Sequence, residues 1–209
     1  MHTAGRLDAD GVQIEVPLKT RLQPPLDALP PVREPGVHPV ARRKRSHPRP
    51  ELDHLAAHDT LTGLANRRRF TEELDRRIRA AEGVDTVIFA DLDGFKAVND
   101  VHGHAAGDEV LRVVAERLAA ETRPEDLVAR LGGDEFAVLC VGLAQGDAAA
   151  LMDRLRTAIA APIRLGDGWV HVGLSIGVAD SFDGTGLEDL LRTADERMYT
   201  DKAARAGTR

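Results

Sequence analysis

Two acidic pairs are the residues of this chain best suited to chemistry. The first lies in residues 130–139, which read Arg-Leu-Gly-Gly-Asp-Glu-Phe-Ala-Val-Leu, so Asp134 and Glu135 directly follow Gly132 and Gly133. A Gly-Gly pair between β-prone segments favours a tight hairpin. Two adjacent carboxylates at its tip repel each other unless a cation or a hydrogen-bond donor compensates. An ordinary solvated turn is the alternative interpretation of this segment taken alone.

The second acidic pair, Asp91 and Asp93, follows the apolar run at residues 86–90. Residues two apart in a strand lie on one face, so both carboxylates should point the same way. In a ferredoxin-like sheet the Gly-Gly hairpin lies beside this strand, and three or four carboxylates then converge. Mg²⁺ prefers a few carboxylates together with phosphate oxygens. The two pairs therefore predict a metal site.

A third segment, residues 99–109, reads Asn-Asp-Val-His-Gly-His-Ala-Ala-Gly-Asp-Glu and is expected to form a Gly-rich loop before a helix. Asn99 and Asp108 border this loop. An Asn side chain both donates and accepts hydrogen bonds, and an Asp accepts two, which suits a guanine base. Alternatively, Asp108 is only the N-cap of the following helix. His104 is a conceivable metal ligand, although a single loop histidine more often has a structural role.

The composition is that of one domain with additional chain. Of the 209 residues 43% are hydrophobic but only 3% are aromatic, so the core must consist of Leu, Val, Ile and Ala. No apolar run approaches the roughly 18–20 residues that span a bilayer, and the N-terminus has no signal-peptide pattern. Cys140, the only cysteine, excludes an internal disulfide and is expected to be a buried hydrophobe. We expect a cytoplasmic protein without a transmembrane segment.

The charge is divided unevenly along the chain. Residues 1–50 carry nine Lys/Arg and five Asp/Glu, a net charge of +4, whereas the remainder carries −10. These first 50 residues also hold most of the prolines and show no periodicity, which predicts a disordered, Pro-rich, basic segment. The folded domain should comprise residues 51–209. Its acidic character argues against nucleic acid as a partner.

The apolar pattern from residue 51 onward predicts alternating helices and strands in the order α-β-α-β-β-α-β-β-α. The four helices are expected at residues 66–81, 111–118, 151–159 and 187–198, and four of the five strands at 86–90, 127–131, 136–141 and 170–178, the last of them half-buried. Paired strands mixed with helices indicate an α+β (α/β sandwich) fold. Its central sheet should be antiparallel or mixed and covered by helices.

Six motifs in this order closely resemble those of the GGDEF domains, the diguanylate cyclases. The resemblance covers about residues 52–205, and it implies a palm-like fold related to that of nucleotide cyclases. The motifs are Asp-Thr-Leu-Thr-Gly-Leu-Ala-Asn-Arg-Arg (59–68), Asp-Leu-Asp-Gly-Phe-Lys (91–96), the segment 99–108, Arg-Leu-Gly-Gly-Asp-Glu-Phe (130–136), Ser-Ile-Gly-Val (175–178) and Ala-Asp-Glu-Arg-Met-Tyr (194–199).

The resemblance implies a role for each matching residue. Asp91 and Asp134 would bind Mg²⁺, or alternatively Mn²⁺, assisted by the Leu92 carbonyl and Glu135, which is also a candidate general base. The residues implied to contact GTP are Asn99 and Asp108 at the guanine, Phe95 and Lys96 near the β- and γ-phosphates, and Lys202 at the γ-phosphate.

The implied reaction joins two GTP molecules into 3′,5′-cyclic di-GMP. The 3′-hydroxyl of one GTP attacks the α-phosphorus of the other, and pyrophosphate leaves. Gly132 and Gly133 would let the backbone approach the phosphates, because a Cβ there would obstruct them. Since one domain holds one GTP, the active form is expected to be a homodimer.

Residues 123–126, Arg-Pro-Glu-Asp, resemble the family's inhibitory site for the product cyclic di-GMP. The guanidinium group of Arg123 can bind a phosphate or a guanine edge. The resemblance implies that Asp126 belongs to the same site and that Arg154 or Arg156 completes it. The simpler alternative is a charged loop before a strand.

The C-terminal segment departs from the family pattern Ala-Lys-x-x-Gly-Arg. Here Asp201 precedes Lys202 and Arg205 comes one position early, which turns its side chain by about 100° on a helix and predicts weaker GTP binding. The Pro-rich segment stands where family members usually carry a sensor domain. A catalytically silent receptor for GTP or cyclic di-GMP is therefore the alternative function. A purely structural dimerisation domain is disfavoured because both acidic pairs are complete.

Overall fold

The structure, a computed structural model, describes residues 6–7, 13–14, 57–80, 83–143, 147–181 and 186–206. The chain divides into two units, Met1–Ser46 and His47–Arg209. In the first unit β1 (Arg6–Leu7) pairs antiparallel with β2 (Gln13–Ile14). The remainder of the segment predicted to be disordered lies outside the described residues. Within the described ranges, no helix combines the length and apolar character needed to cross a membrane.

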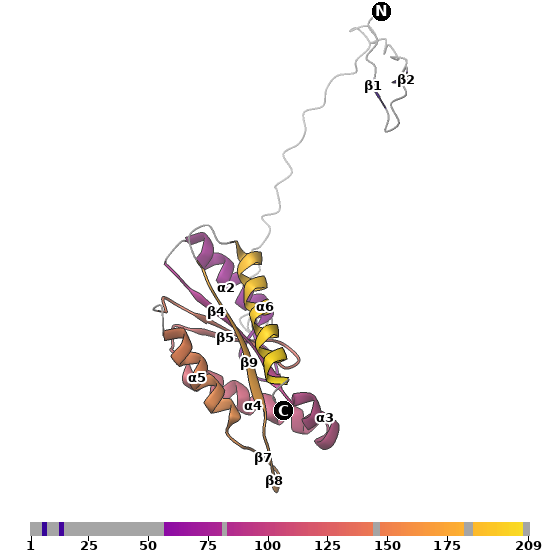
Figure 1. Cartoon of the computed structure of the whole chain (residues 1–209), viewed down its shortest axis with the longest axis vertical. Helices are drawn as coiled ribbons and strands as arrows, with labels where there is room; N and C mark the ends of the chain where they lie inside the picture. Colours follow the sequence, from indigo (N-terminus) through magenta and orange to yellow (C-terminus); the bar gives the residue numbers. More distant parts are fainter. Residues whose placement is uncertain are drawn as a thin grey trace, which may run out of the picture. The chain divides into compact units, whose positions relative to one another are not determined.

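A mixed five-stranded sheet is the centre of the second unit (Figure 1). The strands are ordered β3-β5-β6-β4-β9, so β4 lies between the hairpin strand β6 and the outer strand β9. Only the pairing of β3 with β5 is parallel. The bounds are β3 Ala65–Asn66, β4 Thr86–Asp93, β5 Leu127–Gly132, β6 Glu135–Cys140 and β9 Gly173–Asp180.

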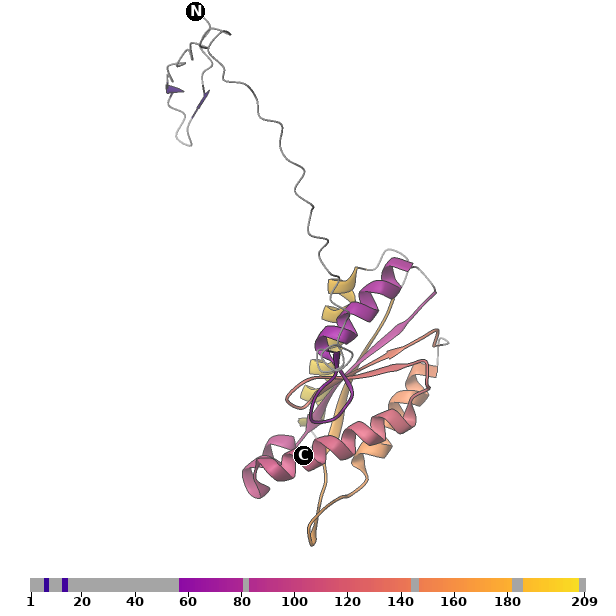
Figure 2. The same cartoon turned by 180° about the vertical axis from the view of Figure 1, so that it is seen from behind.

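Helices cover both faces of this sheet, as the two opposite views show (Figures 1 and 2). One face carries α2 (Arg67–Ala80) and α6 (Leu187–Ala206), and the other carries α4 (His104–Glu121) and α5 (Asp147–Ala160). A further helix, α3 (Phe95–His102), directly follows β4. The predicted α+β fold with a mixed sheet under helices is confirmed.

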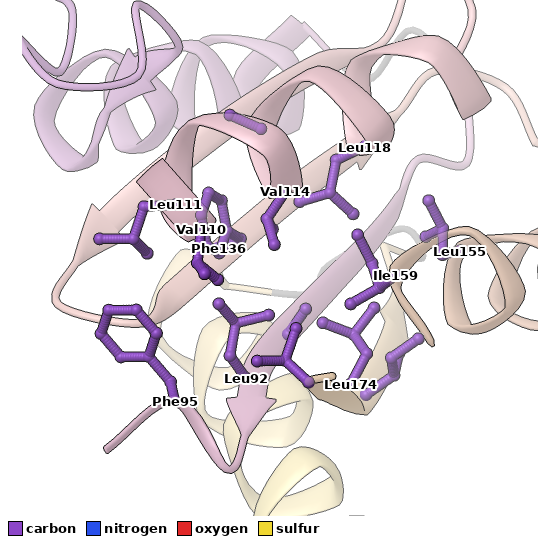
Figure 3. Packing of buried hydrophobic residues seen from close by; sticks show 14 of the residues in the cluster. Leu92, Phe95, Val110, Leu111, Val114, Leu118, Phe136, Leu155, Ile159 and Leu174 are labelled. Atoms are coloured by element: carbon purple, nitrogen blue, oxygen red, sulfur yellow. The ribbon is translucent and has the colours of Figure 1, made fainter. Parts of the chain in front are cut away.

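The larger core lies between the sheet and the α4–α5 layer (Figure 3). Each fully buried aliphatic or Phe side chain there stabilises the fold by about 1.5–3 kcal/mol. Cys140 belongs to this core and is fully buried, and burial raises the pKa of its thiol to about 12. The prediction of a buried hydrophobe is therefore confirmed. The labelled core side chains are Leu92, Phe136 and Leu174 from strands, Phe95 from α3, Val110, Leu111, Val114 and Leu118 from α4, and Leu155 and Ile159 from α5.

The expected loop at residues 99–109 is instead mostly helical. Helix α3 continues to His102, and α4 begins at His104. Between them Gly103, with φ 82°, allows a sharp turn that a side chain would strain. Gly103 is the N-cap of α4, so the alternative role of Asp108 as an N-cap is wrong.

The expected single strand at residues 170–178 is also wrong. Residues Gly168–Val170 form β8, which pairs with β7 (Ile163–Leu165) in a separate hairpin, and β9 begins only at Gly173. Most of β9 is buried rather than half-buried. The alternation is misleading because two of the small residues expected to face solvent are buried: Gly177 lies under the α6 backbone, and Ser175 donates a hydrogen bond to Asp93.

Candidate active site

The Gly-Gly turn is held by an arginine from its own hairpin. Gly132 (φ 143°) and Gly133 (φ 55°) adopt backbone conformations that favour glycine. Arg130 donates through Nε and Nη2 to the Gly133 carbonyl, at 3.0 and 2.8 Å, and its Nη1 lies 3.1 Å from Asp59. Asp59 also accepts hydrogen bonds from the backbone N–H and hydroxyl of Thr62. The motif at residues 59–68 thus braces the hairpin, a role that the sequence did not reveal.

The two acidic pairs meet where β4 runs beside the hairpin. In the β4–β6 ladder Asp91 lies opposite Glu135. The Leu92 N–H donates to the Asp134 carbonyl at 3.3 Å. Asp93, at the end of β4, accepts a 2.7 Å hydrogen bond from the Ser175 hydroxyl on β9. The prediction that the hairpin lies beside the strand that carries Asp91 and Asp93 is therefore confirmed.

Asp91 is the electrostatic centre of this region. It is buried, with 7% of its surface exposed. Burial raises the pKa of Asp91, and the nearby Asp134 and Asp93 raise it further. Lys202 of α6 opposes this effect, since its ammonium lies 2.7 Å from Asp91 Oδ1. The same hydrogen bond raises the pKa of Lys202.

The expected convergence of three or four carboxylates is not formed. Among the residues that the structure describes, no group of three or more His, Cys, Asp or Glu side chains is placed to hold a metal ion. The physical reason is that three of the four acids have another partner. Arg67 of α2 holds Glu135 at 3.1 Å and also donates to the Leu131 carbonyl at 3.1 Å, while Ser175 holds Asp93 and Lys202 holds Asp91.

The donor set nevertheless fits a hard divalent cation. Carboxylates and backbone carbonyls are the ligands that Mg²⁺ takes, and Asp91 and Leu92 of β4 run beside the hairpin turn that carries Asp134. The pKa of Asp91 is raised chiefly by its burial and further by Asp134 and Asp93, while Lys202 lowers it. A cation at this position would favour the ionised form of Asp91.

The residues expected to read guanine are brought together by a glycine. A Cβ on Gly107 of α4 would lie 2.0 Å from Asn99 Oδ1 on α3. The missing side chain therefore lets α3 and α4 approach and places Asn99 against the turn that carries the exposed Asp108. Gly107 was not among the predicted site residues. In the sequence Gly107 is marked only as a glycine next to a predicted helix, which does not by itself indicate a close contact between two helices.

The residues expected at the phosphates differ in exposure. The Phe95 side chain is buried in the core, so only its backbone can face a ligand, whereas Lys96 is exposed. Both lie in the first turn of α3, where N–H groups have no partner within the helix, and the N-cap Gly94 offers no side chain to them. His104 is exposed at the start of α4.

The predicted inhibitory site is a turn with a structural aspartate. Asp126 accepts from the backbone N–H groups of Arg123 and Val141, at 2.9 and 3.1 Å, and the Arg123 side chain is exposed. Of the two further arginines considered, Arg154 contacts Glu121 near this turn. Arg156 instead contacts α6.

Two clefts lie near these sites. One of about 480 Å³ separates the Arg123–Asp126 turn from α2 and is lined by both Asp126 and Arg76. The other, of about 420 Å³, lies over the sheet between α2 and α6 and includes Glu135 and Arg67. The residues predicted to bind guanine do not line either of these two clefts.

Comparison with known proteins agrees with this geometry. The sequence model of the family described as "Diguanylate cyclase, GGDEF domain" matches residues 56–208. Diguanylate cyclase TpbB of Pseudomonas aeruginosa is 46% identical over 166 residues, which are 76% of this chain and 38% of TpbB. The chain spans less than half the length of the curated relatives that it matches.

Solved structures give the same result. The isolated GGDEF domain of TpbB from Pseudomonas aeruginosa superposes with a TM-score of 0.67 at 45% identity, covering 70% of this chain and 89% of that one. The coiled coil and GGDEF domain of DgcB from Caulobacter crescentus, in complex with c-di-GMP, superposes with a TM-score of 0.71 at 29% identity. The match covers 74% of this chain and 85% of that one.

Proposed function

Because the chain belongs to the GGDEF family of diguanylate cyclases, we propose that it is a cytoplasmic nucleotidyltransferase that condenses two GTP molecules into cyclic di-GMP and two pyrophosphates. The observation that carries this proposal is the buried Asp91 carboxylate beside Asp134, whose pKa is raised by burial and by the neighbouring acids and which has Lys202 as its counter-ion. Such a site suits Mg²⁺ or Mn²⁺ with the phosphates of a nucleotide.

The proposed substrate pose uses two regions of the site. Asn99 and Asp108 hydrogen-bond the guanine, with Gly107 keeping their helices close. The polyphosphate lies at the N-terminus of α3, where the N–H groups of Phe95 and Lys96 point toward an anion. Gly132 and Gly133 permit a close backbone approach from the hairpin.

The proposed chemistry is an in-line displacement. A bond forms between the 3′-oxygen of one GTP and the α-phosphorus of the other, and the bond to the leaving pyrophosphate breaks. Asp91, Asp134 and the Leu92 carbonyl would hold a divalent metal, which would supply positive charge opposite the charge that develops on the phosphate. Lys202 then moves from Asp91 to the γ-phosphate. Glu135, at the hairpin, accepts the hydroxyl proton.

A homodimer completes the reaction in this proposal. One domain supplies one nucleotide site, so two domains must face each other for each 3′-hydroxyl to reach the other α-phosphorus. Product inhibition at Arg123 and Asp126 belongs to the same proposal. It is supported by the exposed Arg123 side chain beside a cleft and by the structural similarity to DgcB in complex with c-di-GMP.

The alternative function is a silent receptor for GTP or cyclic di-GMP. The observation that favours it is Arg205, whose Nε is bound to Asp201 at 3.2 Å. A receptor would bind either nucleotide without turnover.

The deciding experiment is incubation of the purified chain with GTP and Mg²⁺, followed by chromatography of the products. We expect cyclic di-GMP from the wild type and a loss of at least about 100-fold in Asp134→Ala, the size typical for removal of a group that stabilises transition-state charge. Asp167→Ala, which changes an exposed acid in the β7–β8 turn, should remain active. Binding of both nucleotides without product, even at high protein concentration, would establish the receptor instead.

A further inference from the structure

Helix α6 covers the open edge of the sheet through two hydrogen bonds. Strand β9 is the outer strand next to β4, so its outward backbone groups have no neighbouring strand in the described sheet. Arg197 Nη1 donates to the Val178 carbonyl at 2.6 Å, and Asp201 Oδ2 accepts from the Ile176 N–H at 2.8 Å. Four residues along a helix and two along a strand both span about 6–7 Å. The two contacts therefore fit one register of α6 on β9.

Between these two contacts the backbones touch. A Cβ on Gly177 would lie 2.0 Å from the Ala194 carbonyl oxygen and 2.2 Å from the Met198 nitrogen. The helix thus rests directly on the strand at this position. Sliding or rotating α6 would break the hydrogen bonds on either side of Gly177.

Asp201 connects three elements at one carboxylate. Besides the Ile176 N–H, its Oδ2 accepts from Arg156 Nη2 of α5 at 2.9 Å and from Arg205 Nε at 3.2 Å. Burial by itself would raise the pKa of Asp201, but the Ile176 N–H and the two guanidinium groups outweigh burial and lower this pKa. Asp201 is therefore an ionised anchor that joins the end of α6 to β9 and α5.

The next residue after this anchor is Lys202. Its ammonium forms a hydrogen bond with Asp91. In the β4–β9 ladder Asp91 lies opposite Ser175, and the next pair along the ladder is Ala90 opposite Ile176. The anchor point of Asp201 thus lies one residue from the ladder partner of Asp91. A shift of α6 by one residue would turn Lys202 by about 100° and remove it from Asp91.

We propose that Asp201 is a positioning residue, which fixes the register of α6 on β9, together with Arg197, so that Lys202 lies against Asp91. Its consequence for catalysis rests on the proposed cyclase function, in which Lys202 passes from Asp91 to the γ-phosphate. The positioning itself depends only on the contacts described above.

Competitive acetylation of lysines tests the positioning without any nucleotide. The full chain is labelled briefly, and mass spectrometry compares Lys202 with the exposed Lys96 as an internal reference. In Asp201→Ala, labelling of Lys202 relative to Lys96 should rise several-fold, because Lys202 is released from Asp91. Glu196→Ala, which removes an exposed ion pair with Arg192 on the same helix, should leave the ratio unchanged.

A second variant keeps the test decisive if Asp201→Ala fails to fold. Asp201→Asn retains an oxygen that can accept from the Ile176 N–H but loses the charge that holds Arg156. Its Lys202 labelling should lie above that of the wild type. A wild-type ratio in a folded Asp201→Ala or, failing that, in Asp201→Asn would overturn the proposal.

Kinetics then separate positioning from general stability. We expect Asp201→Ala to raise the KM for GTP by about tenfold, as is common when a residue that orients a ligand group is lost. In a Lys202→Ala background the same change should add little, because Asp201 acts through Lys202. Additive effects would overturn the proposal. A wild type that forms no cyclic di-GMP would contradict the cyclase function, whereas the labelling ratio would still decide the positioning.

Discussion

Asp91 combines a site for chemistry with a cost to the fold. Its carboxylate is buried beside Asp134 and Asp93, and Lys202 partly compensates for the charge. The pKa of Asp91 is raised in the folded chain, mainly by burial. The stability that Asp91 contributes is therefore present below its unfolded pKa and is lost as the pH rises through the folded pKa. At neutral pH the ionised Asp91 destabilises the metal-free protein.

Replacing Asp91 by Asn should therefore raise the melting temperature of the metal-free protein at neutral pH. This increase in melting temperature should become smaller as the pH falls through the acidic range, because Asp91 of the wild type then becomes protonated and is uncharged, like the Asn side chain. Thermal unfolding followed by circular dichroism at several pH values measures both effects. Cyclic di-GMP formation should fall at least about 100-fold in the same variant. A variant that melts lower than the wild type at neutral pH would contradict this account of Asp91.

A buried ion pair joins helix α2 to the sheet. Arg77 near the end of α2 donates two hydrogen bonds of 2.8 Å to Asp85, just before β4. Only 10% and 5% of these side chains are exposed. The Asp85 N–H also donates to the hydroxyl of Ser181, just after β9, and the Ser181 N–H donates to the Asp85 carbonyl. The ion pair thus fixes α2 where β4 begins and β9 ends.

Substitution of Arg77 by Met should lower the free energy of unfolding by about 3–5 kcal/mol, because Asp85 stays buried without its charge partner. Arg79→Met is a matched control on the same helix, since Arg79 pairs with Asp75 at the surface. The Arg79→Met substitution should lower the free energy of unfolding by less than about 1 kcal/mol. Urea unfolding of both variants measures the difference, and equal losses would refute the role of the buried pair.

The contact between β9 and α6 predicts a second effect at the element scale. Gly177→Ala introduces a Cβ within 2.2 Å of two backbone atoms of α6, so the helix must move. We expect a loss of about 3 kcal/mol in unfolding free energy, as for other overpacked sites, and reduced cyclase activity. Gly168→Ala is the control, because its Cβ would meet its nearest neighbour at 3.7 Å. A stable and fully active Gly177→Ala protein would exclude the close approach.

At the scale of the whole molecule, one folded unit carries one set of the proposed nucleotide contacts. Asn99, Asp108 and the acidic pairs all belong to the single unit His47–Arg209. Closing a ring from two nucleotides requires both of them to be held in line. The proposed function therefore makes catalysis a property of two copies of the chain.

Specific activity should consequently rise with protein concentration and reach a plateau as the dimer forms. Sedimentation velocity under the same conditions should show dimerisation over the same range. An excess of Asp134→Ala protein should lower the activity of the wild type, because mixed dimers contain one defective site. Constant specific activity of a species that sediments as a monomer would rule out the two-copy mechanism.

The sequence by itself determined the order of the main elements, the Gly-Gly hairpin and the neighbourhood of the two acidic pairs. These depend on local patterns: apolar periodicity, glycine in a tight turn and alternation along a strand. Two predictions from local patterns were wrong, the loop at residues 99–109 and the half-buried strand at residues 170–178. The Asn99–Asp108 region is helical on both sides of Gly103, and Gly177 of β9 lies under a helix and does not face water.

Only the tertiary structure decided which partner each charged side chain takes. Lys202 reaches Asp91 across 111 positions of sequence, and Arg67 reaches Glu135 across 68. Asp201 joins α6 to β9 and α5. No local pattern encodes these contacts, because they depend on how helices in one layer are placed on the sheet beneath them. The residues for chemistry are therefore visible in the sequence, whereas their positioning follows from packing between layers.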